Sequence, residues 1–69
     1  MKISARNIVR GTVVEVNKGA VTAHIRIDIG GGVIITSSIT NEAATELGLK
    51  KGMQAYAVIK ASDVMVAVD

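Results

Sequence analysis

Residues 20–29, with the sequence AVTAHIRIDI, alternate strictly between apolar and polar side chains, and this constrains the fold more than any other feature. Successive side chains of a strand point to opposite faces, so a period of two predicts a strand with one buried face and one solvated face. The expected buried face carries Val21, Ala23, Ile25, Ile27 and Ile29, and the solvated face carries Thr22, His24, Arg26 and Asp28.

The segments on either side of this strand predict two more strands and two turns. The β-branched run IVRGTVVEV predicts a first strand, and NKG at residues 17–19 predicts a hairpin in which Gly19 adopts a positive φ. Gly11 lies inside the first run and predicts a bulge or bend there. The glycines at residues 30–32 predict a turn into VIITSSI, the third strand.

The pattern changes at Thr40, where TNEAATELGL predicts one short helix that Thr40 caps and Gly48 ends. Ala43, Ala44 and Leu47 lie on the face that this helix is expected to bury. After the KKG turn, MQAYAVIKA and VMVAV predict a fourth and a fifth strand. The order β-β-β-α-β-β with five short strands is the layout of an OB-like Greek-key barrel, an all-β fold with one short helix.

The amount of apolar surface predicts that copies of the chain associate. The 69 residues include no cysteine, no proline and a single aromatic residue, which indicates one small domain over residues 1–69. A domain of this size is near the limit at which burial within one subunit offsets the loss of chain entropy. Yet 49% of the residues are hydrophobic, more than so short a chain can cover alone. We therefore expect an obligate homo-oligomer.

The ends and the charge of the chain indicate its compartment and its partners only weakly. The first residues, MKISARNIVRG, lack the apolar run of a signal peptide, and no segment approaches a membrane span. A cytoplasmic protein that does not bind membranes is the expectation. The net charge of +2 does not require a polyanion as partner, but it leaves room for a local basic site.

Two pairs of residues, each a hydroxyl and a cation, stand near opposite ends of the sequence. Ser4 and Arg6 are two residues apart, as are Lys60 and Ser62, so in strands each pair would share a face. The first and last strands of a small barrel could bring both pairs around one oxyanion through charge-assisted hydrogen bonds. The alternative is that these are ordinary solvated cations at strand ends. The role of Thr40 also has two interpretations, because a residue at the start of a helix can bind an anion or simply cap the helix.

Other chemistries find little support in the sequence. The triple glycine lacks a following GK[ST] and predicts a turn rather than a phosphate cradle. His24 has no cysteine or second histidine to join it, and Asp28 is four residues away, so no metal-cation site is expected. The serines have no base apart from that histidine, and no carboxylates pair, so we expect no enzyme. Tyr56 alone makes a poor stacking platform, which leaves nucleic-acid binding as a weaker alternative.

Five segments of the chain resemble the molybdate-binding mop domain. They are SARN at residues 4–7, GTV at 11–13, ITNEAATELGL at 39–49, KKG at 50–52 and AVIKASDVMVAV at 57–68. The resemblance is close to that of the bacterial molbindins and covers almost the whole chain. SARN near the start together with KAS near the end is the specific part of the match.

This resemblance implies an OB-like barrel whose strands are shared between subunits, in a hexamer that binds molybdate, or tungstate as its analogue, at subunit interfaces. One class of anion site would draw on two subunits. A second class would lie at a symmetry axis, at the NKGAV hairpin. Regulators of the family carry a serine where Ala43 stands, so here that hydroxyl contact would be absent or replaced by backbone or water. The implied first-class residues are Ser4, Arg6, Thr40, Lys60, Ala61 and Ser62, and the second-class residues are Lys18, Gly19, Ala20 and Val21.

The leading functional prediction is an intracellular molybdate store or buffer. It depends on the sequence holding only the binding module, with no helix-turn-helix segment for DNA and no transporter ATPase segment. A second hypothesis is a regulatory or structural oligomer that senses the anion for a protein partner. An OB-type nucleic-acid binder is the third.

Overall fold

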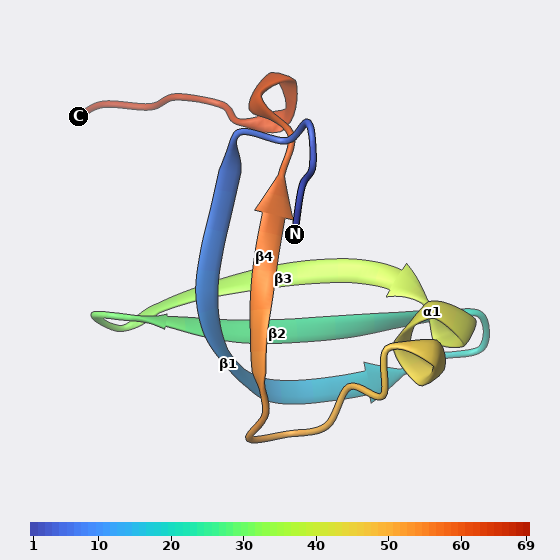
Figure 1. Ribbon diagram of the computed structural model, residues 1–69. Coiled ribbons are helices and arrows are strands. Elements are labelled where there is room, and N and C mark those ends of the chain that lie inside the picture. The colour runs from blue at the N-terminus through green and yellow to red at the C-terminus, as the bar shows by residue number, and fades with distance from the viewer.

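The computed structural model describes all residues, 1–69, and shows one curled antiparallel sheet with a short helix at one end (Figure 1). Its strands are β1 (Asn7–Lys18), β2 (Thr22–Gly30), β3 (Val33–Thr40) and β4 (Gln54–Ile59). Helix α1 (Asn41–Glu46) follows β3, and a 3₁₀ turn, η1 (Ala61–Asp63), follows β4. The predicted mostly-β, OB-like fold with one helix is therefore confirmed, but the chain forms a four-stranded half-barrel rather than a closed five-stranded barrel.

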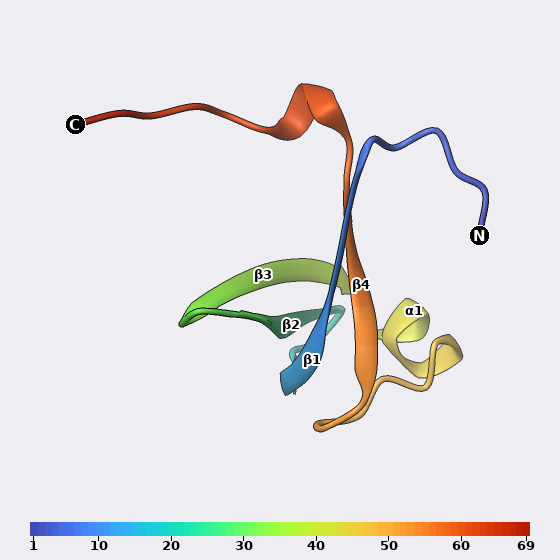
Figure 2. The ribbon, with the colours of Figure 1, turned by 60° about the vertical axis from the view of Figure 1, so that its left-hand side comes forward.

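Strand β1 joins the two halves of the sheet, whose order is β3-β2-β1-β4. Its first half pairs with β4, beginning with Asn7 opposite Ile59, and its second half pairs with β2, ending with Lys18 opposite Ala23. Thr12 belongs to both pairings. The strand therefore bends at its middle, and its first half and β4 stand across the direction of β2 and β3 (Figures 1 and 2).

The bend lies next to a point where β1 and β2 approach each other closely. A Cβ atom on Gly11 would lie 2.6 Å from the carbonyl oxygen of Asp28 and 2.6 Å from Cγ2 of Ile27. The bend predicted at Gly11 therefore forms, whereas the irregularity of the β1–β2 pairing falls between Val13 and Glu15 rather than at Gly11. Gly11 is required for a different reason, because any side chain would force the two strands apart.

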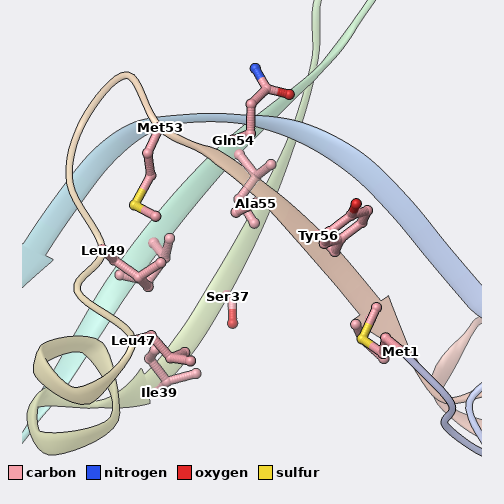
Figure 3. Close-up of a pocket in the computed structure, with 12 residues that line it drawn as sticks. Met1, Ser37, Ile39, Leu47, Leu49, Met53, Gln54, Ala55 and Tyr56 are labelled. Carbon is pink, nitrogen blue, oxygen red and sulfur yellow. The ribbon is translucent and has the colours of Figure 1, made fainter.

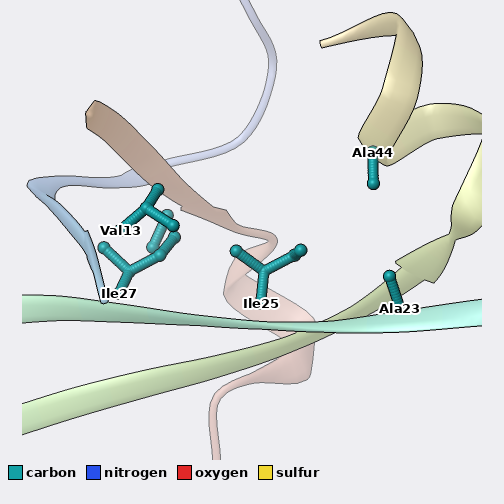
Figure 4. Packing of buried hydrophobic residues seen from close by; sticks show 6 residues of the cluster. Val13, Ala23, Ile25, Ile27 and Ala44 are labelled. Atoms are coloured by element: carbon teal, nitrogen blue, oxygen red, sulfur yellow. The ribbon is translucent and has the colours of Figure 1, made fainter. Parts of the chain in front are cut away.

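The alternation in β2 produces the core. Ala23, Ile25 and Ile27 are buried, as the sequence predicts, whereas Val21 precedes the strand and is exposed. They pack against apolar side chains from β1, α1 and β4 (Figure 4). Only seven of the 69 residues are buried, and the core cluster consists of Val13, Ala23, Ile25, Ile27, Ala44 and Ala57.

The turn at residues 30–32 and the helix form as predicted. All three glycines of the turn have a positive φ, as does Gly48 after the helix. Thr40 caps α1, since its Oγ1 accepts a hydrogen bond of 3.0 Å from the N–H of Ala43. The burial of Leu47 was predicted wrongly: α1 ends at Glu46, and Leu47 is 64% exposed at its C-cap. Neither α1 nor η1 has the length and apolar character of a membrane span.

The β1–β2 hairpin differs from the prediction in its backbone. Gly19 does not adopt a positive φ. Instead its N–H donates a hydrogen bond of 2.7 Å to the carbonyl of Thr22, so the two residues at the tip of the turn are Ala20 and Val21, and neither has a positive φ.

The expected fifth strand, residues 64–68, does not form within the chain. The segment leaves the end of the sheet through η1 and runs away from the rest of the molecule (Figure 2), so it reaches neither free edge of the sheet. Its side chains are among the most exposed apolar groups of the chain, with Met65 at 94%, Val66 at 89% and Val68 at 91%.

Replacing Gly11 with alanine is expected to lower the free energy of unfolding by about 1–3 kcal/mol, because the new methyl group overpacks the β1–β2 contact. Chemical denaturation at one protein concentration measures the change. Gly31→Asn is the control, since Gly31 has no atom near its Cβ direction and asparagine tolerates its φ of 61°. An equal loss in both variants would contradict the close-approach explanation.

Candidate anion-binding sites

The structure brings the N-terminal segment and the end of β4 together at one end of the sheet. Asn7 lies opposite Ile59, so Arg6 and Lys60 each stand next to this last pair of the β1–β4 ladder, and beyond them the two segments run in opposite directions (Figure 2). The side chain of Asn7 strengthens this pairing through a hydrogen bond of 3.1 Å from Nδ2 to the carbonyl of Ile59. The predicted residues Ser4, Arg6, Lys60, Ala61 and Ser62 all belong to these two segments, which we call the open end.

The spacing of the two hydroxyl–cation pairs predicted that they lie on strands, but neither pair does. Ser4 and Arg6 precede β1, and Lys60 follows β4. Lys60 has extended backbone angles and begins η1, in which the N–H of Asp63 donates to its carbonyl at 2.9 Å. The common-face argument is therefore wrong for Ser62, because η1 turns the chain between Lys60 and Ser62. The pairing of β1 with β4 brings Arg6 and Lys60, one member of each pair, to the same end of the sheet.

The polar side chains of the open end are free to bind a ligand. Ser4, Arg6, Lys60 and Ser62 are exposed. None of them takes part in any of the side-chain hydrogen bonds of the structure. Arg6 and Lys60, which flank the Asn7–Ile59 pair, give this end of the sheet two cations with hydrogen-bond donors, a combination that suits an oxyanion.

Thr40 lies apart from the open end. It is opposite Thr22 at the end of β3, beside the β1–β2 hairpin, whereas Arg6 precedes the other end of β1. One chain therefore does not bring Thr40 to the open end. The hydroxyl of Thr40 accepts the capping hydrogen bond from Ala43, which leaves its own proton available to a ligand.

The second predicted site, at Lys18, Gly19, Ala20 and Val21, is attached to α1. Nζ of Lys18 donates to Oγ1 of Thr45 at 2.9 Å. Nδ2 of Asn41 donates to the carbonyl of Gly19 at 2.8 Å, and the backbone N–H of Asn41 donates to the carbonyl of Val21, also at 2.8 Å. No local pattern in the sequence predicted that Asn41 and Thr45 contact the hairpin, because more than 20 residues separate them from it.

A polar hollow lies on the opposite face of the same hairpin. It has a volume of about 170 Å³ and is lined by Asn17, Gly19, Thr22 and His24. Lys18 cannot serve it, because Lys18 pairs with the buried Ala23 while Asn17 pairs with His24 on the outer face. His24 is not part of a metal site, since no group of three or more histidine, cysteine or acidic side chains gathers in the structure.

An apolar groove of about 460 Å³ opens on the inner side of the half-barrel (Figure 3). Ten of its 12 lining residues are hydrophobic, and they come from the N-terminus, β2, β3, β4 and the segment after α1. Figure 3 shows Met1, Ile39, Leu47, Leu49 and Met53 around it.

The chain is similar to known molybdenum-binding proteins over nearly all of its length. The TOBE domain model matches residues 3–66. A probable molybdenum-pterin-binding protein of Haemophilus influenzae is 51% identical over 69 residues, which is all of both chains. A molybdate-binding protein from Sporomusa ovata, known at high resolution, is 37% identical, with a TM-score of 0.92 over 99% of this chain and 100% of that one. The cytoplasmic molybdate-binding protein ModG with molybdate bound is 52% identical, with a TM-score of 0.89 over 94% of this chain and 46% of that one.

Removal of the Thr40 hydroxyl is expected to destabilise the fold through the helix cap. Thr40→Ala should lower the free energy of unfolding by about 1 kcal/mol, because the N–H of Ala43 loses its acceptor. Thr40→Ser keeps a hydroxyl at the cap and should stay close to the unsubstituted protein. Denaturant unfolding compares the three proteins at one concentration, and an unaffected Thr40→Ala would show that the cap does not stabilise α1.

Proposed function

Because the chain belongs to the TOBE domain family, among the molybdenum-pterin-binding or molbindin proteins, we propose that it binds molybdate and serves as an intracellular store or buffer for it. The family consists of binding proteins rather than enzymes, in agreement with the sequence prediction. The observation that supports the proposal is the pairing of Asn7 with Ile59, because it makes Arg6 of SARN and Lys60 of KAS, both exposed and without side-chain hydrogen bonds, flank the same end of the sheet. The likeness to ModG with molybdate bound supports it.

The first class of site uses the open end of one subunit and Thr40 of another. Arg6 and Lys60 supply the positive charge, Ser4 and Ser62 supply hydroxyl protons, and Ala61 supplies a backbone N–H. Thr40 lies near the other end of β1, so it reaches such an anion only from a second copy of the chain. This separation supports a site at a subunit interface.

The second class of site lies at the hairpin, where several subunits meet at a symmetry axis. Lys18 supplies charge there, and the backbone from Gly19 to Val21 lines the site, with the N–H groups of Ala20 and Val21 as its donors because that of Gly19 already donates to Thr22. Repetition of one lysine around an axis concentrates positive charge at a single point, which favours a dianion.

A site built only of donors favours molybdate and tungstate over phosphate. Molybdate and tungstate carry no proton near neutral pH, whereas phosphate keeps a proton that needs an acceptor. Sulfate also lacks a proton, so it is rejected by size: a pocket set for longer metal–oxygen bonds leaves the smaller anion with stretched hydrogen bonds. Molybdate is the ligand that we propose, and tungstate is its analogue.

The proposed assembly is a cytoplasmic hexamer in which subunits share strands. The half-barrel leaves an apolar groove open, and residues 64–68 extend away with exposed apolar side chains. A strand inserted from a second copy would cover the groove and satisfy a free sheet edge at the same time. These two features support the sharing of strands.

Arg6→Ala is expected to lower the affinity for molybdate by at least about tenfold, because it removes a charge-assisted donor from the first class of site. Isothermal titration of the assembled protein measures the affinity in a buffer without phosphate, beside sulfate and phosphate as competing anions.

The matched control for this experiment is Arg10→Ala. Arg10 is also exposed, but it lies on the outer face of β1 and donates to Oε1 of Gln54 at 3.1 Å. Arg10→Ala should bind like the unsubstituted protein. Equal affinity of Arg6→Ala and the unsubstituted protein would remove Arg6 from the site, and no molybdate uptake by any of the three would refute the proposed function.

Val66→Asp is expected to dissociate the oligomer, because a carboxylate on the segment that enters a neighbouring groove would be buried without a partner. Analytical ultracentrifugation measures the mass. Ala67→Asp carries the same charge on the alternate side of an extended segment and should weaken the assembly less. A Val66→Asp protein with unchanged mass would show that the segment does not hold subunits together.

A further inference from the structure

We propose that Thr45 and Asn41 of α1 are positioning residues for the anion at the β1–β2 hairpin. The inference rests on the proposed function, because it concerns the second class of site. Lys18 and the backbone N–H groups of Ala20 and Val21 carry the donors of that site, since the N–H of Gly19 already donates to the carbonyl of Thr22, and α1 holds this segment in the form that an anion requires.

Thr45 directs the ammonium group of Lys18. A lysine side chain is long and flexible, and its position is set only where a partner restrains it. Here Nζ donates to Oγ1 of Thr45 at 2.9 Å, and the hydroxyl of Thr45 donates in turn to the carbonyl of Asn41 at 3.0 Å. That second bond fixes the Thr45 hydroxyl with a lone pair available to Lys18. An ammonium group has three N–H donors, so two remain for an anion.

Asn41 fixes the backbone of the turn. Its side chain donates to the carbonyl of Gly19, and its N–H donates to the carbonyl of Val21, so α1 engages two of the three carbonyl oxygens of residues 19–21. The N–H groups of Ala20 and Val21 are left without a backbone partner. The contacts with Asn41 thus occupy carbonyl acceptors of the turn and leave N–H donors of the turn available, and donors are what an oxyanion needs.

The orientation of the Asn41 amide is also determined. Its Oδ1 is buried and has no hydrogen-bond partner. A flipped amide would place Oδ1 against the carbonyl oxygen of Gly19, so the observed orientation is the one that can bind the turn. An unsatisfied buried oxygen costs free energy, and the bond to Gly19 is what the side chain gains in this position.

These contacts are separate from those that anchor α1 to the fold. The helix is held by the Thr40 cap and by Ala44, which is buried in the core. Asn41 and Thr45 are four residues apart and therefore share a side of the helix, which here contacts the hairpin. Their substitution can accordingly change the hairpin while α1 remains in place.

The test is titration of the assembled protein with molybdate, with Thr45→Val and Thr45→Ser compared. Valine keeps the β-branched shape and a similar helix propensity but lacks the hydroxyl, whereas serine retains it. Thr45→Val should weaken the hairpin class of site about three- to tenfold and leave the Arg6 class unchanged, and Thr45→Ser should restore binding. Asn41→Ala should weaken the same class. Thr36→Val is the matched control on the exposed side of β3 and should have no effect.

A double-mutant cycle with Lys18→Met separates positioning from a general structural role. Lys18→Met should weaken the hairpin class by about tenfold or more, and Thr45→Val should cause no further loss in that background if it acts through Lys18. A Thr45→Val protein that binds normally, or one that loses as much affinity without Lys18 as with it, overturns the inference.

Two further outcomes distinguish the inference from the proposed function. If Lys18→Met leaves binding unchanged while Arg6→Ala weakens it, the hairpin holds no anion and the inference fails, although the proposed function stands. If the unsubstituted protein takes up no molybdate at all, the proposed function fails first and the inference fails with it.

Discussion

The fold depends on how few of its residues one copy of the chain can bury. With seven buried residues, the curled sheet encloses a core from one side only, and the groove opposite stays open. A closed barrel of this length would need a further strand in contact with the sheet, and residues 64–68 point away from it. The groove and the extended segment are thus two consequences of one constraint. The proposed sharing of strands between copies accounts for both, because residues 64–68 of one copy would cover the groove of another.

The same curl determines where ligands can bind. Because β1 pairs first with β4 and then with β2, its two ends lie in different surroundings. One end gathers Arg6 and Lys60 in the open end, and the other carries the hairpin held by α1. Gly11 makes this arrangement possible, since a side chain there would separate the strands where β1 passes from one partner to the other.

Local patterns in the sequence predicted the parts of the fold that local physics determines. The alternation in β2, the turn at residues 30–32 and the Thr40 cap all form as expected. The positive φ predicted for Gly19 was a local error, and the other errors concern features that depend on distant parts of the chain. Leu47 and residues 64–68 are apolar and were assigned contacts that one subunit does not provide. The Lys18–Thr45 contact joins residues 27 positions apart, and no local pattern predicts such a pair.

The candidate sites were only partly predictable for a related reason. The resemblance supplied the residues, and the pairing of β1 with β4 explains why two distant segments meet, but the spacing argument for a common face was wrong. Thr40 remained distant from the open end within one chain. If an anion bridges Thr40 and Arg6 of different copies, then binding and assembly are linked, because a ligand that binds only the assembled form stabilises it in proportion to the logarithm of its concentration. A store built in this way would be most firmly assembled when molybdate is abundant and would loosen as the anion is withdrawn.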